Sequence, residues 1–288
     1  TLKLLSLLYM LGTRASLLCL TMRRAFCHVH PVSATGFSDA SVYSQVRPSY
    51  PSEAVDYALS FVRGRQGAKN VKILDLAAGT GKLTTSLCSK DNIKVVACEP
   101  NDGMIAELKK HQNNASSFEI LKGTAQSIPV ADQTFDAVFV AQAFHWFDNI
   151  ESLEEIARVL VPGGIFSCLW NLESSSVPWM KEIRDIYEKY DGNVPQYRKN
   201  DWQRVFQTPR ALELFPGGYV EKFFEHSQQA SAEEVWLRVL SKSYISSLDA
   251  TCQRNLKQRV FQVLQQYNLI DTTISVPMDT RVIICSKV

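Results

Sequence analysis

The sequence predicts an α/β fold built on an open, mostly parallel sheet with helices on both faces. From Pro51 onward, short apolar runs rich in β-branched residues alternate with helical segments. Strands that are separated by single helices imply right-handed crossovers and therefore parallel neighbours. The run 135–141 is almost wholly apolar, as expected of a parallel strand that helices cover on both faces.

The expected helices follow from hydrophobic periodicity and from capping residues. Ser52 precedes an apolar repeat that predicts a capped helix ending near Gly64. Within 152–160 the apolar residues repeat at i, i+3, i+4 and i+7, which is the spacing of an amphipathic helix, and the V-P-G-G of 161–164 ends it. Further helices are expected over 82–89, after Asn101 or Asp102, and over 256–264.

The expected strands are short runs of β-branched and aliphatic residues. They cover 71–76, 94–98, 118–121, 135–141, 165–170 and 280–286. The alternation of helices and strands fails over 171–247, where Trp, Tyr, Pro and Gln are frequent. We expect this span to be an insertion of helices and loops that forms a lid over the substrate. One domain over 34–288 results, with its core at 51–170 and a C-terminal helix and strand at 248–288.

Residues 1–33 are set apart as an N-terminal extension that is disordered, a targeting segment or a fragment artefact. No acidic residue precedes Asp39, and Arg and Ser are present, which is compatible with a mitochondrial transit peptide. Because the chain begins with Thr, a fragment is equally compatible, and Met22 is a candidate for the true start. We therefore expect a cytoplasmic protein, or a mitochondrial one if the extension is a transit peptide.

Composition and charge argue against several classes of function. The 288 residues are 45% hydrophobic and 21% charged, as in ordinary soluble globular proteins. A net charge of +2 without a basic stripe argues against nucleic acid, whose binding depends on phosphate neutralisation. Arg14 interrupts the apolar N-terminal run, which is then too short to span a bilayer, so no membrane association is expected. The seven cysteines contain no C-x-x-C pair and predict buried side chains, not a disulfide frame or a metal site.

The segment Val71–Lys82, V-K-I-L-D-L-A-A-G-T-G-K, predicts a ligand site. It joins the end of a strand, with Asp75, to a turn that contains Gly79 and Gly81. Glycines allow a ligand to approach the backbone closely, and ligands of open parallel sheets bind at the carboxyl ends of the strands.

Two phosphate-binding interpretations fit this turn poorly. A P-loop requires Ser or Thr where the chain has Leu83, and Gly where it has Leu76. A dinucleotide fingerprint requires Gly or Ala where the chain has Thr84, and the carboxylate of Asp75 would repel a pyrophosphate.

A ligand with a positive end and no phosphate fits better. S-adenosylmethionine carries an amino group and a sulfonium, which a carboxylate at position 75 attracts. Glu99 follows Asp75 by 24 residues, at the end of the next expected strand, where a carboxylate can accept hydrogen bonds from both ribose hydroxyls. The sequence therefore predicts S-adenosylmethionine as the cofactor.

The chain resembles class I S-adenosylmethionine-dependent methyltransferases, in particular the small-molecule branch with trans-aconitate and ubiquinone/menaquinone-type methyltransferases. The match is carried by Y-S-Q-V-R-P-S-Y-P (43–51), L-D-L-A-A-G-T-G (74–81), V-A-C-E-P (96–100), A-Q-A-F-H-W-F-D (141–148) and L-V-P-G-G (160–164). It covers about 37–170 well and the remainder loosely. It implies a seven-stranded Rossmann-like sheet.

The same resemblance implies the residues that bind the cofactor. Glu99 would hold the ribose, Arg47 the carboxylate of the methionine part, and Gln126 the adenine edge. The complete set is Tyr43, Arg47, Asp75, Ala77, Gly79, Gly81, Glu99, Pro100, Met104, Ala125, Gln126, Ala141 and Gln142.

His145 and Trp146 are the candidate catalytic residues. His145 is expected to act as a general base or, alternatively, to form a wall of the active site, and Trp146 offers a ring that stabilises a cation. Methyl transfer is an in-line displacement, so alignment and exclusion of water supply most of the rate. A carboxylate acceptor would need no base.

We expect the methyl acceptor to be a small molecule such as a carboxylic acid. Its pocket would be built from 144–147 and the insertion 171–247, with Arg198 or Arg204 receiving a carboxylate. A protein or nucleic-acid methyltransferase is one alternative, and a non-catalytic methyltransferase-like binding protein is another. The chain is expected to be a monomer or a homodimer.

Overall fold

The computed structural model describes residues 46–63, 70–112 and 117–288. Within these ranges seven strands form one sheet in the order β3-β2-β1-β4-β5-β7-β6. They are β1 (Val71–Leu76), β2 (Ile93–Cys98), β3 (Glu119–Leu121), β4 (Phe135–Ala141), β5 (Leu160–Glu173), β6 (Val220–Ala230) and β7 (Ile274–Ser286). Tyr43 and the extension 1–33 lie outside the described residues.

The strand pairing confirms an open, mostly parallel sheet. β1 pairs in parallel with β2 and with β4, β2 pairs in parallel with β3, and β4 with β5. β7 runs antiparallel between β5 and β6. The chain passes from β1 to β2 on one side, whereas β4 lies on the other, so the strand order reverses at β1 and β4. A ligand crevice is expected outside the carboxyl ends of these two strands.

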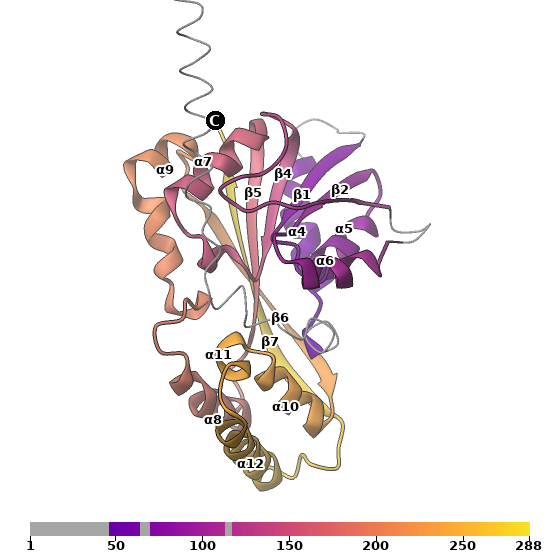
Figure 1. Ribbon diagram of the computed structural model, residues 1–288, viewed down its shortest axis with the longest axis vertical. Coiled ribbons are helices and arrows are strands. Elements are labelled where there is room, and N and C mark those ends of the chain that lie inside the picture. Colours follow the sequence, from indigo (N-terminus) through magenta and orange to yellow (C-terminus); the bar gives the residue numbers. More distant parts are fainter. Residues whose placement is uncertain (1–45, 64–69, 113–116) are drawn as a thin grey trace, which may run out of the picture.

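Helices cover both faces of the sheet, as expected (Figure 1). α4 (Ser52–Arg63), α5 (Lys82–Cys88) and α6 (Asp102–Lys109) pack on one face, and α7 (Ile150–Val159) and α9 (Pro209–Leu214) pack on the other. The remaining helices are α8 (Pro178–Tyr187), α10 (Ala232–Leu240), α11 (Ser243–Ser246) and α12 (Ala250–Gln266), with short 3-10 helices η2 (Phe144–Trp146), η3 (Glu188–Tyr190), η4 (Tyr197–Lys199) and η5 (Asp201–Gln207).

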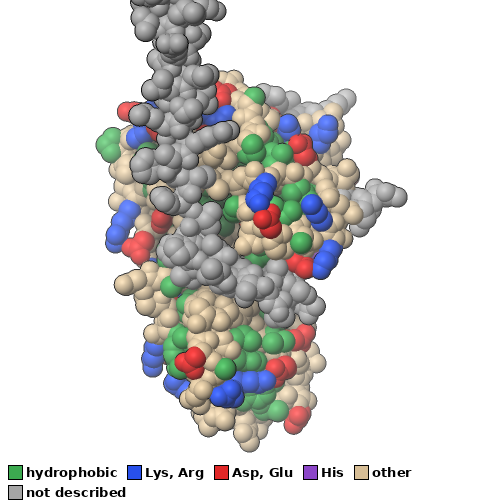
Figure 2. All heavy atoms as spheres, viewed as in Figure 1, with side chains coloured by type: hydrophobic (Ala, Val, Ile, Leu, Met, Phe, Trp, Pro, Cys, Tyr) green, Lys and Arg blue, Asp and Glu red, His purple; other side chains and the backbone are tan. Residues whose placement is uncertain are grey.

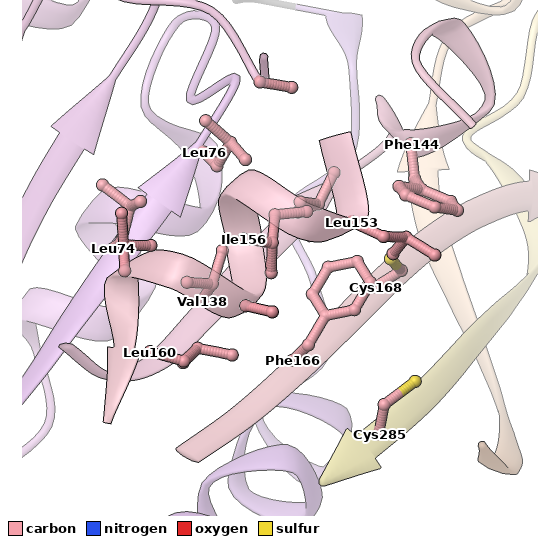
Figure 3. Close-up of a cluster of buried hydrophobic side chains, with 14 of the residues drawn as sticks. Leu74, Leu76, Val138, Phe144, Leu153, Ile156, Leu160, Phe166, Cys168 and Cys285 are labelled. Atoms are coloured by element: carbon pink, nitrogen blue, oxygen red, sulfur yellow. The ribbon is translucent and has the colours of Figure 1, made fainter. Parts of the chain in front are cut away.

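The central strands β1, β4 and β5 contribute to two hydrophobic cores, because successive side chains point to opposite faces. Val138 and Phe166 pack with Ile156 of α7, and Figure 3 shows these side chains together. The residues just before them, Ala137 and Ile165, belong to the core under α4, α5 and α6. Full burial of a large apolar side chain stabilises the fold by about 1.5–3 kcal/mol. The two cores therefore fix the positions of the strand ends.

Side-chain caps start two helices next to the crevice. Oδ1 of Asn101 accepts a hydrogen bond from the amide of Met104 at 3.1 Å, which confirms the expected cap of α6. Oδ1 of Asn149 accepts one from the amide of Ser152 at 2.9 Å, so α7 starts two residues earlier than the apolar repeat predicts. A cap of this kind is worth about 1 kcal/mol.

The span 171–247 is not only helices and loops, because it contains β6, the strand whose position the sequence did not predict. β5 and β7 are also longer than expected. The three long strands reach into the lower part of the molecule in Figure 1, where α8, α10 and α12 gather. There, Ile274, Val276 and Met278 of β7 join these helices in a third hydrophobic core.

Charged side chains of both signs are intermingled among the described residues of the face shown in Figure 2. None of the helices in the described ranges has the length and apolar character needed to cross a membrane. In the same ranges, no group of three or more His, Cys, Asp or Glu side chains is arranged to hold a metal ion.

Candidate active site

A cavity of about 280 Å³ lies outside the carboxyl ends of β1 and β4, at the place where the strand order reverses. The β1–α5 turn, the end of β2, the loop after β3 and the end of β4 line it. It brings together most of the residues predicted to bind the cofactor, namely Arg47, Ala77, Gly79, Glu99, Pro100, Met104, Ala125, Gln126, Ala141 and Gln142. Trp146 also lines this cavity, whereas Asp75, Gly81 and His145 do not.

The β1–α5 turn exposes backbone to the cavity through unusual dihedral angles. Ala77, Gly79 and Gly81 have φ values of 58°, 57° and 89°, in the left-handed region that disfavours side chains. A Cβ at Gly79 would have open space around it, whereas one at Gly81 would lie 2.5 Å from Cδ1 of Leu108. Gly79 therefore leaves room for a ligand, and Gly81 allows α5 to pack closely on α6.

Glu99 ties the turn to the end of β2. Its Oε2 accepts a hydrogen bond from the amide of Gly79 at 2.9 Å, and its Oε1 accepts one from the amide of Asn101 at 3.0 Å. Burial raises the pKa of Glu99, and the two backbone donors oppose that rise. A carboxylate has about four acceptor positions, so two remain for a ligand with hydroxyl groups.

Asp75 lies beneath the turn, fully buried, and does not face the cavity. The hydroxyl of Thr84 donates to its Oδ2 at 2.6 Å, and its Oδ1 forms no hydrogen bond with the described part of the chain. Burial raises the pKa of Asp75 to about 7, to which the charge of Glu99 also contributes. The sequence did not single out two further lining residues, Thr80 and Lys82, although Lys82 directly follows the glycine turn.

The residues present fit S-adenosylmethionine. Glu99 offers free acceptor positions for ribose hydroxyls, and Gly79 leaves space beside exposed backbone. The buried hydroxyl of Thr80 forms no hydrogen bond with any described residue, which leaves a polar group of the turn for a ligand. Apolar lining for an adenine comes from Pro100 and Met104.

A second, smaller cavity of about 70 Å³ adjoins the first and shares Arg47, Gln142 and Trp146 with it. Its other lining side chains are mostly aromatic and polar, and they include His145, Asn171, Tyr187, Tyr197, Arg198, Lys242 and Tyr244. Residues of the predicted insertion thus do come to the site.

The two arginines expected to bind a carboxylate, Arg198 and Arg204, lie in different surroundings. Arg198 lines the second cavity and pairs with Glu188 at 3.0 Å and with Asp191. Arg204 has 82% of its side chain exposed, pairs with Asp201 and does not line the cavity. The prediction that Arg204 faces the substrate pocket is therefore wrong, because η5 turns this side chain to the surface.

Lys242 also lines the second cavity, although no pattern in the sequence indicates it. Its Nζ lies 3.1 Å from both carboxylate oxygens of Glu173, and Nε of Arg238 donates to Oε1 of Glu173 at 2.6 Å. Burial, with the charges of Arg47 and Arg238, lowers the pKa of Lys242 to about 8, against the opposing effect of Glu173. The ion pair with Glu173 favours the cationic form of Lys242.

His145 lies between the second cavity and the core. The indole Nε1–H of Trp170 donates a hydrogen bond to Nδ1 of His145 at 3.3 Å. Burial, together with the charge of Arg47, lowers the pKa of His145 to about 3. The ring centroids of His145 and Trp146 are 5.3 Å apart.

Hydrogen bonds hold the segment before α4 against both cavities. Nη2 of Arg47 donates to the carbonyl of Ser241 at 3.0 Å, and Nδ2 of Asn171 donates to the carbonyl of Ser49 at 3.1 Å. Nε2 of Gln142 in turn donates to the carbonyl of Asn171 at 2.8 Å. The wall shared by the two cavities is thus joined to β5 and to the end of α10.

Comparisons with known proteins place the chain among methyltransferases. Residues 74–168 match a family described as a methyltransferase domain. The chain is 39% identical over 160 residues to an uncharacterized methyltransferase of Mycobacterium tuberculosis, covering 56% of this chain and 61% of that one. It is 30% identical over 192 residues to a ubiquinone/menaquinone biosynthesis C-methyltransferase of Rickettsia massiliae, covering 62% of this chain and 74% of that one.

The fold also matches that of a solved structure. It is a provisionally assigned type II methyltransferase from Anaeromyxobacter dehalogenans, which matches with a TM-score of 0.57 and covers 84% of this chain and 97% of that one. Because only 17% of the aligned residues are identical, this likeness concerns the fold alone. The match to the mycobacterial relative spans about three fifths of that protein, 61% of its length.

Proposed function

Because the chain belongs to the class I S-adenosylmethionine-dependent methyltransferases, we propose that it transfers a methyl group to a small molecule held in the second cavity. The observation that carries this proposal is the junction between the two cavities. Arg47, Gln142 and Trp146 line both, so a group in the small cavity can meet a group in the large one.

The first cavity is the proposed cofactor site. Glu99 holds the ribose hydroxyls, Gly79 leaves its backbone open to the methionine part, and Ala125 and Gln126 border the adenine. When bound, S-adenosylmethionine supplies an electrophilic methyl group on its sulfonium. The resemblance also assigns Tyr43 to this site, which stays a prediction.

The protein contributes alignment and exclusion of water. Trp146 lies at the junction, where its ring can face a cation, and Gln142 has a φ of 58° that is held by its hydrogen bonds to β5. A ligand whose reacting atoms are held in line reacts in an effectively unimolecular step. His145 and Trp146 are the residues we propose to contact the acceptor.

The acceptor is proposed to be a small carboxylic acid. Arg47, Lys242 and Arg198 place positive charge on the wall of the second cavity, although Lys242 is paired with Glu173 and Arg198 with Glu188. A carboxylate acceptor has no proton to lose. The Rickettsia relative is named for the biosynthesis of ubiquinone and menaquinone, which supports a small molecule as the substrate class.

Calorimetric titration with S-adenosylmethionine and S-adenosylhomocysteine tests the cofactor site. Glu99→Ala is expected to weaken binding at least about 10-fold, because a buried carboxylate that holds hydroxyl groups is lost. Asp102→Ala is the matched control, since its side chain is 81% exposed and pairs with Lys122. Absence of binding by the unaltered chain would refute the proposal.

Incubation of the chain with labelled cofactor tests the acceptor class. The panel contains small carboxylic acids, thiols and phenols, with a protein extract and RNA as separate arms. Transfer to small acids is expected. Transfer to protein or RNA alone would favour a macromolecular substrate, and cofactor binding without any transfer would favour a non-catalytic binding protein.

A further inference from the structure

The hydrogen bond between Trp170 and His145 determines where the imidazole carries its proton. An indole nitrogen is a donor only, so the partner nitrogen must be an unprotonated acceptor. The indole of Trp170 donates to Nδ1 of His145, and both residues are buried. A neutral imidazole with an unprotonated Nδ1 carries its proton on Nε2. This assignment follows from the donor chemistry of indole and not from observed hydrogen positions.

The surroundings of His145 favour the neutral ring. Trp170 is fully buried behind it, and the cationic side chains of Arg47 and Lys242 line the same cavity. Burial and the charge of Arg47 lower the pKa of His145 to about 3, which agrees with this geometry. A second proton on the ring would also disrupt the hydrogen bond from Trp170.

His145 has one ring nitrogen, Nε2, left over for the second cavity. His145 lines that cavity and not the larger one. Its Nδ1 is taken by Trp170, and its Nε2 forms no hydrogen bond with the described residues. The Nε2–H group is therefore left to donate to a ligand of this cavity.

We propose that His145 is a neutral hydrogen-bond donor to the methyl acceptor through Nε2–H, and that Trp170 fixes this tautomer. The proposal rests on the methyl transfer proposed above, because it assigns the second cavity to the acceptor. It excludes His145 as a general base, since the nitrogen that faces the acceptor already carries a proton. The site then selects an acceptor with a hydrogen-bond-accepting oxygen at this point and disfavours a group that only donates.

Nitrogen-15 NMR of the full chain with labelled histidine tests the tautomer without any acceptor. The chain has five histidines, and the signals of His145 are identified by their loss in His145→Gln. We expect a protonated Nε2 and an unprotonated Nδ1 from pH 5.5 to pH 8. A charged ring at pH 6, or a proton on Nδ1, would overturn the proposal.

Trp170→Phe tests the source of the tautomer in the same spectra. The substitution removes the indole donor while it keeps an aromatic ring, so we expect His145 to show a mixture of the two tautomers. Binding of S-adenosylhomocysteine serves as the check that the variant is folded. A folded variant in which Nε2 remains the only protonated nitrogen would refute the role of Trp170.

The role in acceptor binding is tested with an acceptor found in the labelled-cofactor panel. His145→Leu is expected to lower kcat/KM about 10-fold, the loss of one hydrogen bond. His145→Gln, whose amide can donate from a similar position, should recover most of that loss. Equal losses in both variants would indicate a structural role and overturn the proposal. Affinity for S-adenosylhomocysteine should stay unchanged in both variants. Failure of the unaltered chain to bind S-adenosylhomocysteine would count against the proposed function and not against the role of His145.

Discussion

The hydroxyl of Thr84 donates a 2.6 Å hydrogen bond to Oδ2 of Asp75, and both side chains are fully buried beneath the glycine turn. Burial nevertheless raises the pKa of Asp75 to about 7. A carboxyl group at this position thus exchanges its proton near neutral pH, and the stability of the fold and of the turn should depend on pH through it.

Asp75→Asn is expected to stabilise the protein more at pH 8 than at pH 5. Because the folded state binds the proton more tightly than the unfolded state, Asp75 lowers the free energy of unfolding progressively between about pH 4 and pH 7, and the loss is complete above that window. The side chain of Asn does not ionise, so the variant does not lose free energy of unfolding in this way. Its free energy of unfolding relative to the parent should rise by about 2–3 kcal/mol between pH 5 and pH 8.

Urea unfolding at a series of pH values measures this difference. Asp102→Asn is the control, because its exposed carboxyl group pairs with Lys122 at the surface. A stability difference between Asp75→Asn and the parent that does not change with pH would show that Asp75 is already ionised throughout the range.

Gly81→Ala should destabilise the protein more than Gly79→Ala. Both positions have positive φ, which costs a side chain about 1–2 kcal/mol. At Gly81 the new Cβ would also lie 2.5 Å from Cδ1 of Leu108, whereas at Gly79 it would meet open space. We expect a further 1–3 kcal/mol, roughly, for the overpacked variant in thermal or urea unfolding.

The same pair should rank differently in cofactor binding. Gly79 lines the large cavity and Gly81 does not, so Gly79→Ala should weaken binding of S-adenosylhomocysteine in calorimetry even though it folds well. If Gly81→Ala were the better-folded variant, the assignment of Gly81 to helix packing would be wrong.

Asn171→Ala is expected to weaken S-adenosylhomocysteine binding about 10-fold, the effect of one or two lost hydrogen bonds. Its amide holds the carbonyl of Ser49 and so positions the segment that carries Arg47. Ser167→Ala is the matched control on the same strand, because its hydroxyl donates only to the carbonyl of Ile283 within the sheet. Calorimetry of both variants decides the point: equal affinities would mean that this segment does not contribute to binding of S-adenosylhomocysteine.

The larger cavity could be predicted from the sequence because its parts are local. The glycine turn, Glu99 and the Asn101 cap each depend on a few neighbouring residues, and the parallel sheet then brings the strand ends to one edge. The sequence did not predict which residues of the turn face the cavity and which lie buried behind it. Asp75 lies under the turn and Gly81 packs on α6, which only the packing of helices decides.

The second cavity could not be predicted in the same way. β6 is an edge strand whose side chains are largely exposed, so V-E-K-F-F-E-H-S-Q-Q-A lacks the apolar signal of a buried strand. An ion pair with Glu173, 69 residues away in the sequence, holds Lys242 at the second cavity. No local sequence pattern predicts such a contact. Arg204 resembled Arg198 in the sequence, but the turn of η5 exposes it.

Glu173→Gln should cost about 3–5 kcal/mol of stability, because it leaves buried cations without their counter-charge. Glu173 is 3% exposed and contacts both Arg238 and Lys242. Burial alone would raise its pKa, but the charges of Lys242 and Arg238 outweigh burial and hold the pKa well below its usual value. Its stabilising contribution is therefore present above about pH 4.5, the usual pKa of a free Glu, and is lost as the pH falls further.

Urea unfolding at pH 7 and at pH 4 measures both parts of this expectation. The difference between Glu173→Gln and the parent should be largest at pH 7 and shrink toward acid. Asp185→Asn is the control, since its pair with Lys181 lies at the surface with both side chains more than half exposed and should contribute little. In a double-mutant cycle, Lys242→Met should recover part of the loss in the Glu173→Gln background, because it removes one of the uncompensated cations. A Glu173→Gln variant as stable as the Asp185→Asn control would mean that Lys242 and Arg238 find other partners, and that Glu173 does not hold Lys242 at the second cavity.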